Sequence, residues 1–236
     1  MGSPITATGR VASMHLFSVH GLGIVGAVGR MGVDRVHLRR TQGLVFWKLL
    51  GTGDGRTFTV RDADPTTWGL FCVWDSDDAR QAFIRSPTMR GWGHIADEVW
   101  SADLTPLRWK GAWSGHSPFD GNERGVDDGG QVAALTRARI KVGQWRTFWA
   151  AVPPVAVTAA HAPGRRFAIG IGEAPVGLQA TFSVWDNSAA LDAFAYGTDT
   201  HRHVIRRTNT SGWYAEEMFT RFAVTATSGT VGGVVV

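Results

Sequence analysis

The stretch FCVWDSDDARQAF at residues 71–83 recurs as FSVWDNSAALDAF at residues 182–194. The two copies match at phenylalanine, at Val-Trp-Asp and at Ala-Phe, with a constant offset of 182 − 71 = 111 residues. In both copies an apolar run ends at Val-Trp, and the Asp with Ser or Asn that follows is typical of a helix N-cap. A match at fixed spacing indicates an internal repeat, so we expect two copies of one strand–helix unit.

A second pair of anchors lies farther along each copy. DEVW at residues 97–100 aligns with EEMF at residues 216–219, with an offset of 216 − 97 = 119 residues. The second copy is therefore expected to be longer by 119 − 111 = 8 residues between the anchors. Because the extra residues lie around His201, we expect the repeat to be asymmetric and to hold a single ligand site in its second half.

Each copy is interpreted as a strand, a helix, two strands, a helix and a final strand, which is the ferredoxin-like plan. Two such units in one chain predict an α+β fold in which two tandem ferredoxin-like repeats form an intrachain dimeric α/β-barrel. The expected boundaries are a first half at residues 14–110, a connector at 111–131, a second half at 132–224 and a flexible tail at 225–236.

The individual elements follow from local patterns. Apolar and alternating runs predict strands at residues 14–19, 45–50, 70–74, 132–141, 166–171 and 180–185. Helices are expected directly after Ser76, at residues 144–152, and from residue 186 through residue 196. The glycine-rich run at residues 21–32 is expected to be a loop that leads into a short helix.

Composition limits the classes of function. The net charge of +4 comes from scattered basic residues, which argues against a nucleic-acid partner. Cys72 is the single cysteine, so an intrachain disulfide is impossible, and its place in a strand favours a small buried hydrophobe. No apolar run is long enough for a transmembrane segment, and we expect a cytoplasmic protein, with peripheral attachment to a membrane left open. The 11 tryptophans suit core filling or the walls of a cavity for a flat or apolar ligand.

Residues 201–222, HRHVIRRTNTSGWYAEEMFTRF, contain the densest group of candidate site residues. If residues 201–208 are helical, His201 shares a face with Val204 and Ile205, whereas His203 lies largely on the opposite face. An imidazole that points into apolar surroundings either finds a hydrogen-bond partner or binds a metal, including a haem iron. His201 is therefore either a satisfied core histidine or a metal ligand.

Several short motifs, spread in order over nearly the whole folded chain, resemble one family. They are KLLGTG (48–53), WSGHSPF (113–119), VAALTRARI (132–140), FWAAVP (148–153), IGIGEAP (169–175), QATFSVWD (179–186) and HRHVIRRT (201–208) with GWYAEEMFTRF (212–222). Together they resemble the spheroidene monooxygenase family of carotenoid-modifying oxygenases. The resemblance implies a haem b enzyme that uses dioxygen and an external electron donor, such as a ferredoxin, to hydroxylate an acyclic carotenoid, and repeated hydroxylation gives a ketone.

The resemblance also assigns expected roles to particular residues. His201 matches the family's histidine and is the expected iron ligand, with His203 as the alternative. The residues expected to contact the cofactor are Lys48, Arg206, Arg207 and Arg221, as cations for the haem propionates, and Trp213. Glu216 and Glu217 are candidate catalytic groups that orient the axial imidazole or deliver protons, and their alternative interpretation is a solvated helix end.

Two other functions stay open from the sequence. One is a haem-dependent lyase resembling aldoxime dehydratase, because histidine-ligated haem on a dimeric α/β-barrel also supports chemistry without oxygen insertion. The other is a non-catalytic protein that binds or stores haem, or that binds another ligand without a cofactor. A homo-oligomer is compatible with the sequence.

Overall fold

The computed structural model describes residues 9–53, 63–140, 162–173, 178–197, 214–233 and 235–236. The elements in chain order are β1 (Val11–Ser18), α1 (Leu22–Arg39), β2 (Leu44–Gly53), β3 (Ala63–Trp74), α2 (Asp77–Phe83), α3 (Pro87–Gly93), β4 (Glu98–Gly111), β5 (Val132–Ile140), β6 (Arg165–Gly172), β7 (Leu178–Trp185), α5 (Ser188–Gly197) and β8 (Tyr214–Gly229). The helix expected at residues 144–152 and the helix expected at residues 201–208 lie outside the described residues.

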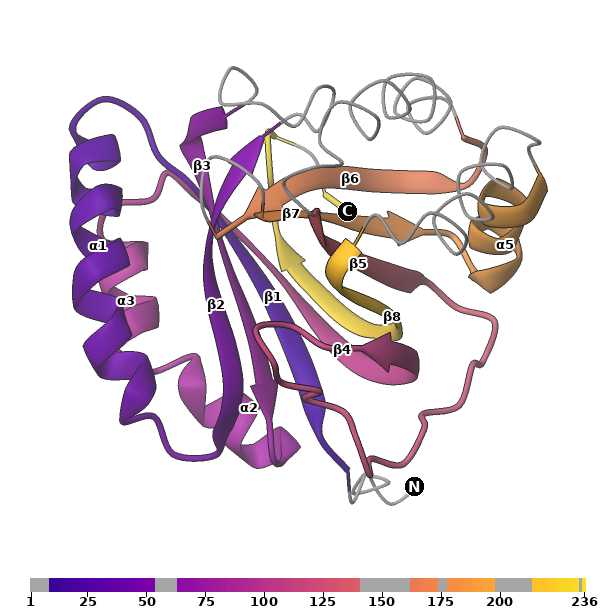
Figure 1. Ribbon diagram of the computed structural model, residues 1–236. Coiled ribbons are helices and arrows are strands. Elements are labelled where there is room, and N and C mark those ends of the chain that lie inside the picture. Colours follow the sequence, from indigo (N-terminus) through magenta and orange to yellow (C-terminus); the bar gives the residue numbers. More distant parts are fainter. Residues whose placement is uncertain (1–8, 54–62, 141–161, 174–177, 198–213, 234) are drawn as a thin grey trace, which may run out of the picture.

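The eight strands form a closed antiparallel barrel in the order β1-β3-β2-β6-β7-β5-β8-β4. The strands of the first half follow the order β4-β1-β3-β2, and those of the second half follow the same order, β8-β5-β7-β6. The pairs β2–β6 and β4–β8 join the halves and close the barrel. Figure 1 shows α1 and α3 outside the first half and α5 outside the second half, so the fold is a mixed α and β structure with helices around the barrel.

The two copies of the repeated sequence occupy matching places in the barrel. Trp74 is the last residue of β3, and Trp185 is the last residue of β7. Trp74 pairs with Val11 at the start of β1, just as Trp185 pairs with Val132 at the start of β5. A helix follows each tryptophan, and Ser76 caps the first of these helices by accepting a hydrogen bond from the backbone N–H of Ala79. The helix predicted after Ser76 is confirmed.

The strand register corrects the second alignment of the repeat. Phe17 of β1 pairs with Val99, and Ala138 of β5, its counterpart, pairs with Glu217. Glu217 is therefore equivalent to Val99, with an offset of 217 − 99 = 118 residues rather than 119. A slip of one residue reverses the face on which a strand side chain lies, so the predicted alignment of Glu217 with Glu98 was wrong.

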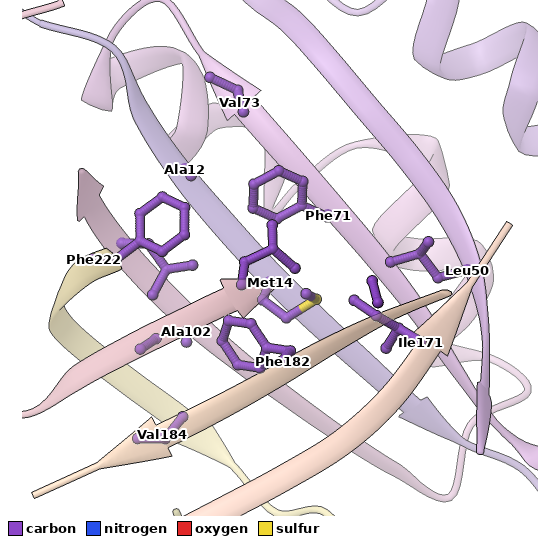
Figure 2. Packing of buried hydrophobic residues seen from close by; sticks show 14 of the residues in the cluster. Ala12, Met14, Leu50, Phe71, Val73, Ala102, Ile171, Phe182, Val184 and Phe222 are labelled. Atoms are coloured by element: carbon purple, nitrogen blue, oxygen red, sulfur yellow. The ribbon is translucent and has the colours of Figure 1, made fainter. Parts of the chain in front are cut away.

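The barrel interior is packed with apolar side chains from both halves (Figure 2). Met14, Leu50 and Phe71 of the first half meet Phe182 and Phe222 of the second, and all five are buried. A separate cluster lies between the first-half strands and helices α1 to α3. Because the apolar core inside the barrel contains side chains from both halves, neither half can bury its inner face without the other.

Helix α1 is longer than the sequence predicted. It begins at Leu22 and runs for 18 residues, through the glycine-rich stretch that was expected to be a loop. Its inner side packs on the first half with Ala27 and Leu38 buried. Among the helices that the structure describes, none is long and apolar enough to cross a membrane. At the other end of the chain, β8 continues to Gly229, past the predicted boundary at residue 224.

Candidate functional site

A cluster of charged side chains faces the interior of the barrel. Side chains alternate between the two faces of a strand, and Lys48 lies on the same face of β2 as Phe46 and Leu50 of the apolar interior. Arg137 on β5 follows Ala133 and Leu135 of that interior in the same way. We name these two cations and their carboxylate partners the interior cluster, which consists of Lys48, Arg137, Glu173 and Glu216.

Glu173, directly after β6, joins three groups of this cluster. It pairs with Lys48, accepts a hydrogen bond of 2.8 Å from the indole Nε1 of Trp113, and lies 3.6 Å from the guanidinium of Arg137. The Lys48 ammonium also donates to the Ser114 hydroxyl at 2.6 Å. The cluster therefore holds the loop after β4, and it keeps Trp113 packed in the barrel interior.

Glu216 binds the same loop from β8. Its carboxylate pairs with Arg137 and accepts backbone N–H bonds from Ser114 at 3.0 Å and Gly115 at 2.7 Å. Ser114 and Gly115 both have positive φ, a conformation in which successive N–H groups can converge on an anion. Burial raises the pKa of Glu216, but the Gly115, Arg137 and Ser114 hydrogen bonds outweigh it, so the pKa lies below its ordinary value. Glu216 is a carboxylate at neutral pH and therefore a poor proton donor.

The interior cluster contains two cations and two carboxylates, so it is balanced in charge. Arg137 is only 2% exposed, and its Nε has no partner among the described residues. Local sequence pattern did not mark Arg137, Glu173 or Trp113 as site residues. Each of them nevertheless lies within one of the family motifs, at VAALTRARI, IGIGEAP and WSGHSPF. Motifs far apart in the chain thus meet at one cluster.

The outer face of the sheet differs between the halves. In the first half, Trp47, Leu49, His15 and Leu70 fill the space beneath the helices. The strands of the second half pair in the equivalent register, and they carry smaller side chains at the positions equivalent to these four residues. We name this surface the small-residue face, and it consists of Ala134, Thr136, Ala168, Gly170, Thr181 and Ser183.

Strand β8 adds charged and aromatic groups to the small-residue face. Glu217, Phe219 and Arg221 pair with Ala138, Thr136 and Ala134 of β5, respectively, and share their side of the sheet. Arg221 pairs with Asp192 of α5, and Glu217 pairs with Lys110 at 2.9 Å. The small side chains of this face leave room for a flat cofactor, and the Arg221 guanidinium could pair with an acidic group of such a cofactor.

The structure separates several residues that sequence analysis grouped. Lys48 and Glu216 face the interior, whereas Arg221 and Glu217 lie on the outer face, so Lys48 and Arg221 do not share one site. Glu216 and Glu217 lie in β8, and the interpretation as a solvated helix end was wrong. The other predicted cofactor residues lie outside the described residues, and they are His201, His203, Arg206, Arg207 and Trp213.

Cys72 is a free thiol, buried in β3. Burial raises its pKa well above the ordinary value of a thiol. It packs on the helix-covered face of the first half with Leu70 and Trp74. The predicted role of Cys72 as a small buried hydrophobe is therefore confirmed, and it does not lie at either polar site.

The fold is shared with enzymes of known structure. Two aldoxime dehydratase structures superpose with TM-scores of 0.59 and 0.62, at 9% and 11% sequence identity. The first alignment covers 95% of this chain and 83% of the other, and the second, with a complex containing butyraldoxime, covers 94% and 84%. At this identity the similarity defines the fold alone: the chain is an α/β-barrel protein with helices packed outside a closed sheet.

Sequence relatives define the family more closely. The chain is 34% identical over 224 residues to spheroidene monooxygenase of Rhodobacter capsulatus, covering 93% of this chain and 92% of the relative. It is 36% identical to the Rubrivivax gelatinosus protein, covering 92% and 83%, and 32% identical to the Cereibacter sphaeroides protein, covering 86% and 62%. No protein-family model matches the chain. These relatives are oxidoreductases, and the chain belongs to the spheroidene monooxygenase family.

Proposed function

We propose that this chain is a haem-dependent monooxygenase that hydroxylates a hydrophobic substrate, an acyclic carotenoid, and converts it to a ketone by repeated hydroxylation. The observation that carries the proposal is the 34% identity to spheroidene monooxygenase along 93% of the chain. In this proposal the protein is cytoplasmic, uses dioxygen, and receives electrons from an external donor such as a ferredoxin.

The small-residue face is the proposed site of haem b. In this proposal His201 ligates the iron, with His203 as the alternative, and Arg206, Arg207 and Trp213 contact the cofactor. Arg221 could pair with a haem propionate in place of Asp192. Lys48 points into the barrel and therefore does not contact the proposed haem. Bound haem iron would supply dioxygen binding and one-electron chemistry.

The protein's own groups have defined tasks in this proposal. The apolar barrel interior lies behind the strands of the small-residue face and excludes water from that side of the sheet. Monooxygenation reduces one oxygen atom to water and therefore needs protons. Glu217 lies on the small-residue face and is the proposed carboxyl group for that transfer. Glu216 instead anchors the Trp113 loop, because it faces the interior and is bound by Arg137 and two backbone N–H groups.

We also infer that the halves are tandem ferredoxin-like repeats that form an intrachain dimeric α/β-barrel. The repeated strand order supports this inference. So do the equivalent contacts at the strand ends, where Trp74 packs on Phe83 at 4.8 Å between ring centroids and Trp185 packs on Phe194 at 5.1 Å. Duplication of one unit, followed by replacement of large side chains with small ones on the outer face of one half, would give a single cofactor site in a protein with two similar halves.

The iron ligand can be tested with two variants. His201→Ala is expected to abolish stoichiometric haem binding, whereas His203→Ala retains most of it, because only His201 shares a predicted helical face with Val204 and Ile205. Spectral titration of the apoprotein with haem measures both. Equal retention in the two variants would remove His201 from the axial position, and the reverse order would assign it to His203.

The reaction can be tested with labelled dioxygen. The haem-loaded protein, with reductant and ¹⁸O₂, is expected to give a labelled carotenoid alcohol, measured by mass spectrometry before exchange of any ketone oxygen with water. An unlabelled dehydration product formed from an aldoxime without oxygen would favour the lyase alternative. Stoichiometric haem without turnover of either substrate class would favour a haem-binding protein, and a chain that takes up no haem would contradict the proposed cofactor.

A further inference from the structure

Helix α1 presents an apolar face to solvent. Leu22 is 89% exposed and Val25 is 71% exposed. The other large apolar side chains on the outer part of the helix are also exposed, and they are Val28, Val33 and Val36. Figure 1 shows α1 at the edge of the molecule, on the side away from α5 and the second half. The exposed face is therefore remote from the small-residue face.

The opposite side of α1 is apolar as well. Ala27 and Leu38 are buried against the first half, and Ile24 and Met31 pack on the same cluster. A surface helix normally carries polar residues on its outer side, and a helix that is apolar all round is normally covered all round. The outer residues of α1 thus form one apolar patch along a single helix, which indicates a partner.

The exposed charges within α1 itself are of one sign. The sole carboxylate in α1 is Asp34, which is buried and paired with Arg30. Arg35, Arg39 and the following Arg40 are exposed, and all three lie in or directly after the second half of the helix. The neighbouring α3 contains no acidic residue. Aliphatic side chains bordered by arginines match the two components of an anionic lipid surface, which are its acyl chains and its headgroups.

We propose that the outer face of α1 docks on an anionic membrane surface, with Leu22, Val25 and Val36 in the acyl boundary and Arg35 and Arg39 at the headgroups. The docked helix lies parallel to the membrane plane and does not cross it. This attachment depends on neither haem nor substrate, so it can be tested apart from the proposed reaction.

The composition of the face favours lipid over a second copy of the chain. Gly29 and Gly32 lie in the middle of the outer face, where a side chain would enter open space. A contact between two α1 helices would bury only a few aliphatic side chains from each copy, well below the roughly 800 Å² per partner of a stable interface. A lipid surface needs no complementary shape and accepts the same residues.

The test is flotation of the full-length protein with vesicles of phosphatidylcholine, alone or mixed with phosphatidylglycerol. The wild type is expected to float with the mixed vesicles, less so at high salt. Val25→Asp with Val36→Asp is expected to lower the bound fraction at least about tenfold. Arg35→Gln with Arg39→Gln is expected to lower it about tenfold on mixed vesicles.

Matched controls lie elsewhere on the surface. Val126 is 83% exposed in the connector, so Val126→Asp changes a valine that is more accessible than Val25 and Val36, lies away from α1 and should leave flotation unchanged. Arg108→Gln with Arg124→Gln removes two exposed arginines from other regions and should also have little effect. Circular dichroism checks that each variant is folded. A wild type that never floats, or an equal loss in the controls, overturns the proposal. So does a wild-type dimer that the α1 valine variant converts to monomer without any vesicle binding.

Discussion

Adjacent glutamates on β8 show how one residue position decides a role. Glu216 is held inside the barrel by Arg137 and the loop N–H groups, whereas Glu217 pairs on the outer face with the largely exposed Lys110. Glu216→Gln is expected to cost about 2 kcal/mol of unfolding free energy, because it leaves the buried Arg137 with a weaker partner. Glu217→Gln should cost under about 1 kcal/mol. Urea unfolding of both variants measures the difference, and equal losses would contradict it.

The lowered pKa of Glu216 also predicts a pH dependence. A carboxylate whose pKa is lower in the folded state stabilises the fold fully above its unfolded value, here 4.5, and loses this contribution as pH falls through the folded value. The wild type should therefore lose its advantage over Glu216→Gln as the pH drops below about 4.5. If the free energy of unfolding changed with pH in the same way for both proteins, the pKa of Glu216 would not be lowered by folding.

His15 should dominate acid sensitivity at higher pH. Burial, with a smaller effect from Arg80, lowers the pKa of His15 from 6.5 to about 4, and the neutral ring hydrogen-bonds Ser101 and Ser13. Since the unfolded state takes up the proton first, His15 should lower the free energy of unfolding by roughly 3 kcal/mol between about pH 6.5 and about pH 4, and its contribution should level off below that range. His15→Gln can bond both hydroxyls without titrating, so its curve should be flatter over this range. An equally steep curve would assign the loss to other groups.

The sequence predicted residue types better than it predicted their faces. Glu216 and Glu217 were selected together because they are adjacent, and strand pairing then placed them on opposite sides of the sheet. Arg137 in β5 and Glu173 directly after β6 were missed because a single charged residue in or beside a strand carries no local sign of burial. Their ion pairs join positions distant in the chain, which only the barrel brings together.

At the scale of elements, Gly111 links the end of β4 to the loop that carries Trp113. Its φ is +83°, and a side chain there would overlap the carbonyl oxygen of Glu217 on β8. Gly121 has a φ of +73° with open space around it. Gly121→Ala should therefore cost about 1 kcal/mol for the backbone conformation alone, and Gly111→Ala should cost clearly more. Thermal unfolding compares them, and equal shifts would mean that β4 and β8 separate freely at that point.

Helix α1 shows why local propensity misled the prediction. Glycines at positions 23, 26, 29 and 32 weaken a helix and favoured a loop. In the folded protein Gly26 lets α1 approach Ile95, whose side chain would lie 3.3 Å from a Cβ at that position. Packing of Ile24, Ala27 and Met31 on the barrel supplies the stability that the glycines lack. Tertiary contact thus outweighs propensity, and this contact was not visible in the sequence.

At the scale of the whole molecule, the repeat predicted two similar halves but could not predict where they differ. The closed barrel has one interior that both halves share, so the inner faces of both halves remain largely apolar and bulky. The outer faces have no such constraint. Leu49 and Leu70 of the first half correspond to Gly170 and Thr181 of the second, and this loss of volume is the basis of the proposed cofactor site.

That difference can be tested by restoring the bulk of the first half to the second. Ala168→Trp copies Trp47, and Thr181→Leu copies Leu70. Because Ala168 is exposed and Thr181 is half-buried, the double variant should fold. Its added side chains would occupy the proposed haem surface, so haem affinity should fall by at least about tenfold, as expected for overpacking a binding site.

The control is Ser183→Cys, which copies Cys72 at nearly constant size and should bind haem like the wild type. The readouts are the Soret band on titration and the melting temperature of the haem-free proteins. A folded double variant with unchanged haem affinity would show that the cofactor binds elsewhere, even if His201 is its ligand.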